Sequence, residues 1–101
     1  MAETRLRWMR AAKRDLAELR QRIALNAPRR AREYVRRLKE AVDDLRRFPQ
    51  LGAVVEELDD PEIHDIVFDR YRVIYRYDGT MVRILRIWPG AKPLTGDRLG
   101  G

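Results

Sequence analysis

The sequence predicts an α+β protein: an N-terminal short strand and an antiparallel two-helix hairpin packed on one face of a small twisted, mainly antiparallel sheet. Three observations predict this fold. Apolar residues recur at helical spacing between residues 11 and 48, strand-like alternation follows Pro49, and an Asp-Gly dipeptide separates two strand-like segments. A chain of 101 residues has the length of one domain. We expect residues 1–94 to form that domain and residues 95–101 to be a flexible tail.

The first predicted element is a strand at TRLRWM (residues 4–9). Leu6 and Trp8 alternate there with Arg5 and Arg7, so one side of the strand is apolar and the other is basic. Alternation of this kind is typical of a half-buried strand.

Two amphipathic helices are predicted next, separated by NAP (residues 26–28). Asn26 is a good helix cap and Pro28 fits the first turn of a helix, so this break ends one helix and begins another. Helices joined by so short a break lie antiparallel. The first apolar stripe contains Ala12, Leu16, Leu19 and Ile23, and the second contains Ala31, Tyr34, Val35, Leu38, Val42, Leu45 and Phe48.

The remaining strands are predicted at AVVEEL (53–58), at IHDIVF (63–68) and on both sides of Asp78-Gly79. An Asp-Gly pair favours a two-residue type I′ turn, which would pair Tyr75 with Val82. Alternation then assigns one set of side chains to the helices and a mixed basic and apolar set to the opposite side, which we call the outer face. The predicted helix-facing set is Tyr71, Val73, Tyr75, Val82, Ile84 and Trp88, and the predicted outer face is Arg72, Ile74, Arg76, Met81, Arg83, Leu85 and Ile87.

Charge is segregated along the chain into three blocks. Residues 1–47 carry fifteen Arg or Lys against seven acids, residues 48–69 carry seven acids and no base, and residues 70–101 carry seven bases against two acids. Either the acidic block folds onto basic neighbours, or a basic face stays open to a partner. Because charged groups are not buried without partners, the outer face must face solvent or be covered, and its composition suits a partner protein.

The composition also excludes several classes of site. The chain has no Cys, which excludes disulfides and cysteine-bound metal, and no Ser, which excludes a serine nucleophile. The single histidine, His64, cannot build a metal site without help from carboxylates. No apolar run has the ~18 residues of a membrane span. We therefore expect a cytoplasmic protein that needs no metal or cofactor.

Cleavage of RNA is the one enzymatic chemistry that these residues could support. Arginine can stabilise a phosphorane, but it is a poor acid or base, so another group would have to move protons. The candidate proton carriers are Tyr71, Tyr75, Tyr77, His64 and Lys92.

The order of these elements and four short motifs resemble a known family. The motifs are W-x-x-x-A-x-x-D-L starting at Trp8, FPQLG (48–52), YRVIYR (71–76) and VRILRIWPGAK (82–92). Over roughly residues 4–94 the chain resembles the RelE/ParE superfamily of toxins from bacterial type II toxin–antitoxin modules. The resemblance implies that the outer face is a functional groove. It also implies that a neighbouring gene encodes an antitoxin, which covers this groove with an extended, acidic and apolar segment.

The resemblance implies one of two targets. RelE-like members cleave mRNA on the ribosome, whereas ParE-like members poison DNA gyrase. In the RelE pattern, an arginine and a basic residue after the last strand contact phosphate, and Arg72 and Lys92 match these positions. That pattern also has a proton carrier, either a tyrosine in the tail or a histidine just before the GAK turn. This chain has Pro89 in the histidine position and no tyrosine after Tyr77, which favours the ParE-like branch.

A non-enzymatic gyrase inhibitor is therefore the favoured interpretation. The alternatives are a RelE-like ribosome-dependent mRNA endoribonuclease and an inactive toxin-fold protein that only binds antitoxin. The resemblance further implies growth inhibition, plasmid stabilisation and a ParD-like ribbon-helix-helix antitoxin, with a homodimer or a heterotetramer with antitoxin as the assembly. The predicted partner- or target-binding residues are Arg72, Ile74, Arg76, Met81, Arg83, Leu85, Arg86 and Lys92.

Overall fold

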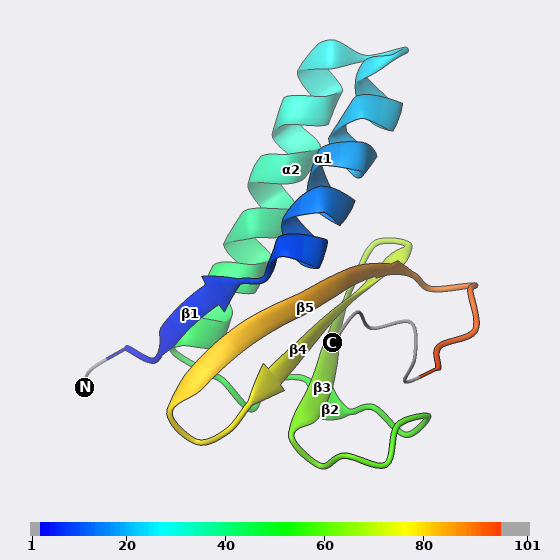
Figure 1. Cartoon of the computed structure of the whole chain (residues 1–101). Helices are drawn as coiled ribbons and strands as arrows, with labels where there is room; N and C mark the ends of the chain where they lie inside the picture. The colour runs from blue at the N-terminus through cyan, green and yellow to red at the C-terminus, as the bar shows by residue number, and fades with distance from the viewer. Residues whose placement is uncertain (1–2, 96–101) are drawn as a thin grey trace.

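A computed structural model describes residues 3–95 of the chain (Figure 1). Its elements in order are β1 (Arg5–Trp8), α1 (Arg10–Ala24), α2 (Pro28–Asp43), the 3-10 turn η1 (Asp44–Arg46), β2 (Ala53–Val54), β3 (Ile63–Phe68), β4 (Tyr71–Tyr77) and β5 (Met81–Pro89). The five strands form one open sheet in the order β1-β5-β4-β3-β2. All neighbouring pairs are antiparallel except β1 and β5, which are parallel. The predicted fold class is confirmed.

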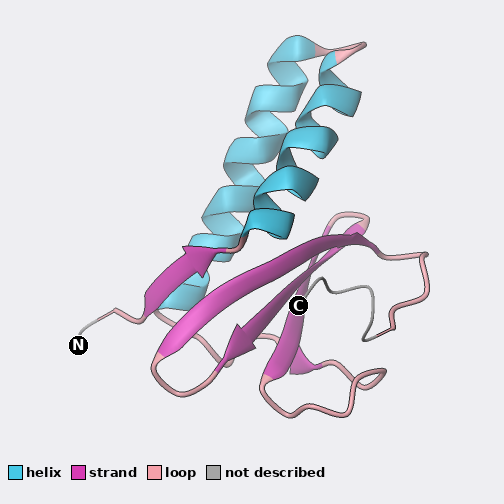
Figure 2. Cartoon of the chain, viewed as in Figure 1, coloured by secondary structure: helices cyan, strands magenta, loops and turns pink. Residues whose placement is uncertain are grey.

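The two helices form the predicted antiparallel hairpin on one side of the sheet (Figures 1 and 2). Pro28 occupies the start of α2 as predicted, but the capping position belongs to Ala27, which offers no side-chain hydrogen bond, rather than to Asn26. The second helix was predicted to reach Phe48. Helical structure instead ends with η1, and the Phe48 side chain is 58% exposed.

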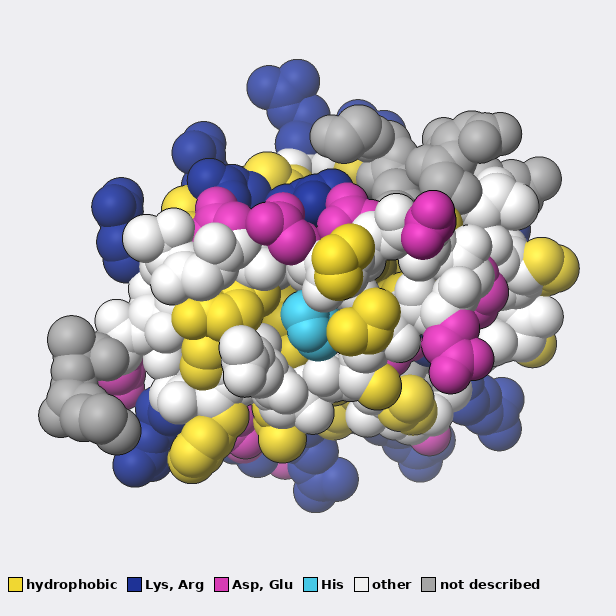
Figure 3. All heavy atoms as spheres, turned by 90° about the horizontal axis from the view of Figure 1, so that it is seen from below, with side chains coloured by type: hydrophobic (Ala, Val, Ile, Leu, Met, Phe, Trp, Pro, Cys, Tyr) yellow, Lys and Arg dark blue, Asp and Glu magenta, His cyan; other side chains and the backbone are white. Residues whose placement is uncertain are grey.

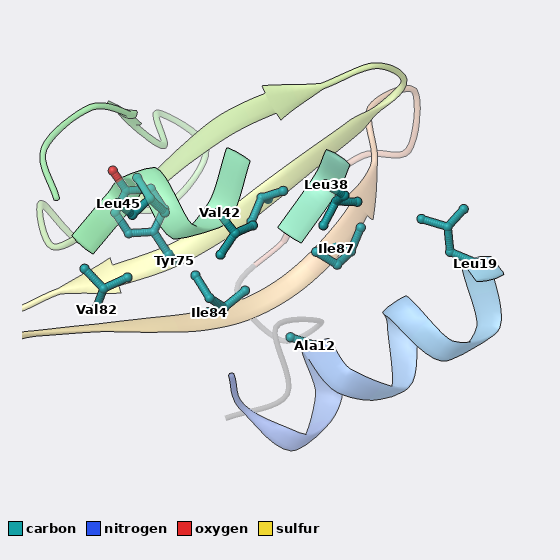
Figure 4. Packing of buried hydrophobic residues seen from close by; sticks show 10 residues of the cluster. Ala12, Leu19, Leu38, Val42, Leu45, Tyr75, Val82, Ile84 and Ile87 are labelled. Atoms are coloured by element: carbon teal, nitrogen blue, oxygen red, sulfur yellow. The ribbon is translucent and has the colours of Figure 1, made fainter. Parts of the chain in front are cut away.

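The main core lies between the helix hairpin and the sheet. Strand side chains face side chains of both helices and η1 across this layer (Figure 4). The buried members are Ala12, Leu19, Leu38, Val42, Leu45, Val73, Tyr75, Val82, Ile84 and Ile87. The helix-facing prediction is therefore confirmed for Val73, Tyr75, Val82 and Ile84.

The turn between β4 and β5 is longer than predicted. Val82 pairs with Tyr77 rather than with Tyr75, so the connection is not a two-residue type I′ turn. Only Gly79 has a positive φ there, and the Asp78 carboxylate accepts hydrogen bonds from the backbone N–H groups of Thr80 and Met81. The register differs from the prediction by two residues, and a shift of two leaves each side chain on its predicted face.

One extra residue in β5 does move side chains between faces. Tyr75 pairs with Ile84 and Ile74 pairs with Arg86, so Leu85 has no partner of its own and forms a β-bulge. Beyond the bulge the alternation is inverted. Ile87 lies in the core under the helices, and Trp88 lies on the outer face, so both predictions for these two residues were wrong.

A carboxylate from α1 holds this bulge in place. Asp15 Oδ2 accepts hydrogen bonds from Arg86 Nε at 2.7 Å and from the backbone N–H of Ile87 at 2.9 Å, and Asp15 Oδ1 accepts from a second nitrogen of Arg86. The motif residue Asp15 thereby satisfies a strand amide at the point where β5 has passed the end of β1. Both charged side chains are mostly buried, with Asp15 11% exposed.

The outer face is covered by the protein's own chain. Only Ala53–Val54 of the predicted strand AVVEEL is in the sheet, and the segment 55–62 turns across the outer face instead. Val55, Ile63, Ile74, Trp88 and Leu94 are buried together there, with Leu58 and Leu85 packed against them. Residues 96–101, which hold most of the predicted flexible tail, lie outside the described residues.

Truncating the main core should destabilise the protein strongly. Ile84→Ala removes a fully buried side chain, so we expect the free energy of unfolding to fall by about 2–5 kcal/mol in urea titrations. Val67→Ala is the matched control, because Val67 lies on a strand but is 74% exposed, and we expect a change within about 0.5 kcal/mol. Equal losses in the two variants would contradict the assignment of the core.

Removing the charge that holds the bulge should also destabilise. We expect Asp15→Asn to lower the free energy of unfolding by about 1.5–3 kcal/mol, because a mostly buried guanidinium loses its carboxylate. The control is Asp43→Asn, which breaks an exposed ion pair with Arg46, and we expect it to cost less than about 1 kcal/mol. A smaller effect at Asp15 than at Asp43 would show that the bulge does not depend on this contact.

Candidate functional site

Two arginines of the outer face, Arg72 and Arg76, form ion pairs with the acidic block of the chain. Arg72 donates from Nε to Asp65 at 2.5 Å and from a terminal nitrogen to Glu57 at 2.6 Å, and its side chain is 17% exposed. Arg76 contacts Asp60 at 2.9 Å and Glu62 at 3.0 Å. Of the two alternatives that the charge pattern allowed, folding of the acidic block onto basic neighbours holds for these two arginines.

These ion pairs shift the protonation equilibria of their members. The hydrogen bond from Arg72 holds the pKa of Glu57 below its ordinary value. Asp60 also has a lowered pKa, first because it accepts the backbone N–H of Glu62 and second because of Arg76. The same carboxylates raise the pKa of both guanidinium groups, so Arg72 and Arg76 stay charged.

The other predicted binding residues fall into different surroundings. Arg83 contacts the Asp78 carboxylate of its own turn at 2.9 Å, and Arg86 is held by Asp15. The Lys92 ammonium lies 4.8 Å from the centre of the Trp88 ring, whose indole N–H donates to the Lys92 carbonyl. Arg86 lies 5.2 Å from the same ring.

The apolar members of the predicted site are only partly accessible. Ile74 is completely buried under the segment 55–62, whereas Met81 and Leu85 are half-buried. Ile74 therefore packs against the protein's own chain, including Val55, in this structure. Seen from below in Figure 3, acidic side chains form a row with basic side chains directly behind it.

Within the described residues no tyrosine or histidine hydrogen-bonds to Arg72, whereas Tyr71 lines the same pocket as Arg86 and Lys92. The Tyr75 hydroxyl donates to the Pro49 carbonyl at 2.8 Å and accepts the Gly52 N–H at 2.9 Å, and burial raises its pKa. Tyr77 donates to the carbonyl of Gly79. Tyr71 packs with the helix-side core, where its hydroxyl accepts a long hydrogen bond from Arg22.

His64 also lies apart from the arginines. Its Nδ1 is 3.0 Å from the Glu62 carbonyl and its ring stacks on Tyr75, which belongs to the helix-side core. The histidine is visible in Figure 3 among hydrophobic side chains. Close packing explains the glycine of the FPQLG motif, because a side chain on Gly52 would collide with the backbone of Asp65 and with the Tyr75 hydroxyl.

Sequence reasoning missed two residues of the outer face, Arg5 and Arg7. Their alternation with Leu6 and Trp8 was recognised, but the strand that receives β1 was not. Parallel pairing with β5 places Arg5 beside Met81 and Arg7 beside Arg83. Paired residues project to the same face, so both arginines extend the outer face past its predicted limit.

Residues 3–95 contain no cluster of three or more His, Cys, Asp or Glu that could hold a metal ion. They also contain no helix that is long and apolar enough to span a bilayer.

The contact between Glu57 and Arg72 should be visible in a titration. We expect the Glu57 carboxyl to titrate below its ordinary value of 4.5 in carbon-detected NMR, and to return toward that value in Arg72→Met. Because the folded pKa is the lower one, this contact stabilises the fold above the unfolded pKa, and the stabilisation is lost as pH falls through the folded pKa. An unshifted Glu57 in the wild type would show that the acidic segment is not held on Arg72.

A family model matches most of the chain. The family model of the ParE toxin of the type II toxin–antitoxin system parDE matches residues 6–94. A search of curated proteins finds no match. Among solved structures, the fold is similar to a chain of the chromosomal ParDE toxin–antitoxin system from P. aeruginosa, with 23% identity and a TM-score of 0.73 over 86% of this chain and 96% of that one.

A second solved structure carries a related fold. It is the toxin–antitoxin complex RelBE2 from Mycobacterium tuberculosis, with 27% identity and a TM-score of 0.63 over 86% of this chain and 98% of that one. The family model spans both helices and every strand from β3 to β5. Because the family model covers residues 6–94, this chain belongs to the ParE family of toxins from type II toxin–antitoxin systems.

Proposed function

We propose that this toxin arrests growth in the cytoplasm by binding DNA gyrase and trapping it on cleaved DNA, and that a cognate antitoxin neutralises it. The observation that favours gyrase over RNA as the target is that Arg72 is already paired with carboxylates of its own chain. Two carboxylates occupy its guanidinium, and no tyrosine or histidine of the described residues hydrogen-bonds to it. RNA cleavage needs a free cation for the phosphate and a proton carrier beside it.

The end of β5 supports the same conclusion. Pro89 occupies the position where the RelE pattern has a histidine, and it pairs with Tyr71 at the last register position of the sheet. Proline has no ionisable side chain, so it cannot transfer a proton there.

Neutralisation by an antitoxin is supported by the family and by the surface. The two similar solved structures are toxin–antitoxin complexes or systems by their own descriptions. The outer face combines arginines with half-buried Met81 and Leu85, a composition that an acidic and apolar segment would complement. A ParD-like ribbon-helix-helix protein, assembled with the toxin as a heterotetramer, is the partner we propose.

The gyrase proposal is tested with purified toxin in a supercoiling reaction. We expect relaxed plasmid to remain relaxed and linear DNA to accumulate after detergent and protease treatment, because trapped gyrase leaves both strands cut. Pre-incubation with the product of the adjacent reading frame should restore supercoiling, which controls for contaminating nuclease.

Two other outcomes would each end the proposal. Unaffected supercoiling together with mRNA cleavage in the ribosomal A site, seen by toeprinting, would assign the RelE-like activity. Normal growth on expression without antitoxin, with neither activity present, would identify an inactive member of the family.

A further inference from the structure

The positive charge of the helix hairpin is concentrated at the end that carries the turn between α1 and α2. Residues 19–32 contain five arginines and no acidic residue. All five arginine side chains are exposed. Figure 1 shows that this turn lies at the end of the hairpin away from the sheet. We call the five residues the arginine tip: Arg20, Arg22, Arg29, Arg30 and Arg32.

The arginine tip lacks the ion pairs that neutralise the arginines further along α2. Glu33 forms ion pairs with both Arg36 and Arg37. Within residues 3–95 no member of the arginine tip has an ion pair, and Arg22 donates a hydrogen bond of 3.5 Å to the Tyr71 hydroxyl. The unneutralised charge of the hairpin therefore lies at its projecting end.

Three of these arginines occupy positions that are unfavourable for the fold itself. Arg29, Arg30 and Arg32 follow Pro28, where α2 begins. The amino-terminal end of a helix carries partial positive charge, so acidic side chains are favoured there and basic ones are not. The first turn of α2 has no acidic residue, and its cap Ala27 offers no side-chain hydrogen bond. Arginines that oppose the helix dipole in this way are better explained by an anionic ligand than by stability.

The directions of the arginines favour phosphate over a protein surface. Successive helical positions are rotated by about 100°, so Arg29, Arg30 and Arg32 project to different sides of α2, and the two arginines of α1 also diverge. A flat partner meets one side only, whereas a groove with phosphates along both walls meets several. Within residues 19–32 only Leu25 is a large and exposed hydrophobic residue, which is too little for the apolar core of a protein interface.

The arginine tip suits double-stranded DNA better than single strands or RNA. Single-stranded nucleic acids bind by stacking bases on aromatic rings, and residues 19–32 contain no aromatic residue. The major groove of DNA is about 12 Å wide and admits a helix of about 10–12 Å diameter, whereas the major groove of an RNA duplex is too narrow. The first turn of α2 therefore fits the groove of DNA, with arginines beside the phosphates of both strands.

We propose that the arginine tip binds the phosphate backbone of double-stranded DNA, without reading its base sequence. The toxin itself makes this contact, so the inference goes beyond the choice of gyrase as the target and does not depend on it. In a complex with gyrase on cleaved DNA, the hairpin would contact the DNA while other surfaces of the toxin contact the enzyme.

The test measures binding of a labelled short DNA duplex to the purified toxin by fluorescence anisotropy at several salt concentrations. The comparison probes are one strand of that duplex and an RNA duplex of the same sequence, and polyglutamate is an unlabelled competitor. The test variant is Arg29→Gln/Arg30→Gln. The matched control is Arg5→Gln/Arg7→Gln, which removes the same charge from two exposed arginines of β1 that also lack ion pairs within residues 3–95.

We expect the DNA duplex to bind the wild type more tightly than the single strand or the RNA duplex. Five arginine–phosphate contacts give a slope of about −4.5 for log affinity against log salt concentration, and the test variant should reduce its magnitude by about 2. At low salt the test variant should bind DNA about tenfold more weakly, and the control less than about twofold, because two charge-assisted contacts are lost only in the first.

The melting temperature provides a second readout. It should be equal to or above that of the wild type in the test variant, because the substitutions remove two charges that oppose the dipole of α2. A lowered melting temperature would assign these arginines a structural role and contradict the proposal.

Four binding results would also overturn it. These are equal losses of affinity in the two variants, no binding of the DNA duplex to the wild type, tighter binding of the single strand or the RNA duplex, and displacement of the DNA by an equal charge of polyglutamate, which would indicate an acidic protein partner. No gyrase is present in these measurements, so a failed supercoiling test and a failed DNA-binding test are distinguishable.

Discussion

The Asp15 contact at the β5 bulge is the constraint on which the rest of this structure depends. A single carboxylate on α1 accepts hydrogen bonds from Arg86 and from the amide of Ile87, and so stabilises one unpaired residue, Leu85, in the longest strand. The bulge inverts the alternation that follows it. Ile87 completes the core under the helices, and Trp88 becomes the largest apolar side chain of the outer face.

The position of Trp88 in turn explains the acidic cover. Trp88, Ile74 and Ile63 form a hydrophobic cluster on the outer face. Val55 and Leu94 are buried against this cluster. Burial of this segment brings Glu57 to Arg72 and Asp60 to Arg76. The pair of Arg72 with Asp65 is the most buried of these contacts, so it is more effective than an ion pair on an open surface. The electrostatics around Arg72 and Arg76 thus follow from packing.

Much of the fold was predictable because its signals are local. Helix spacing predicted both helices, and alternation predicted β1 and the full extent of β3. The faces of Val73, Tyr75, Val82 and Ile84 were also correct, since a register error of two residues preserves alternation. The candidate site was less predictable. Ile74 and Arg72 were predicted to bind a partner or target, because a sequence pattern shows which side chains share a face and not whether another segment of the same chain covers that face.

By itself, the sequence determined the type and order of the elements, the segregation of charge into blocks and the absence of cysteine and serine chemistry. These follow from spacing and composition over a few neighbouring residues. Only the tertiary structure decided the parallel pairing of β1 with β5, the extra residue Leu85 and the partners of each arginine. These depend on contacts such as that between Asp15 and Arg86, 71 positions apart, and no local pattern specifies which distant carboxylate a guanidinium meets.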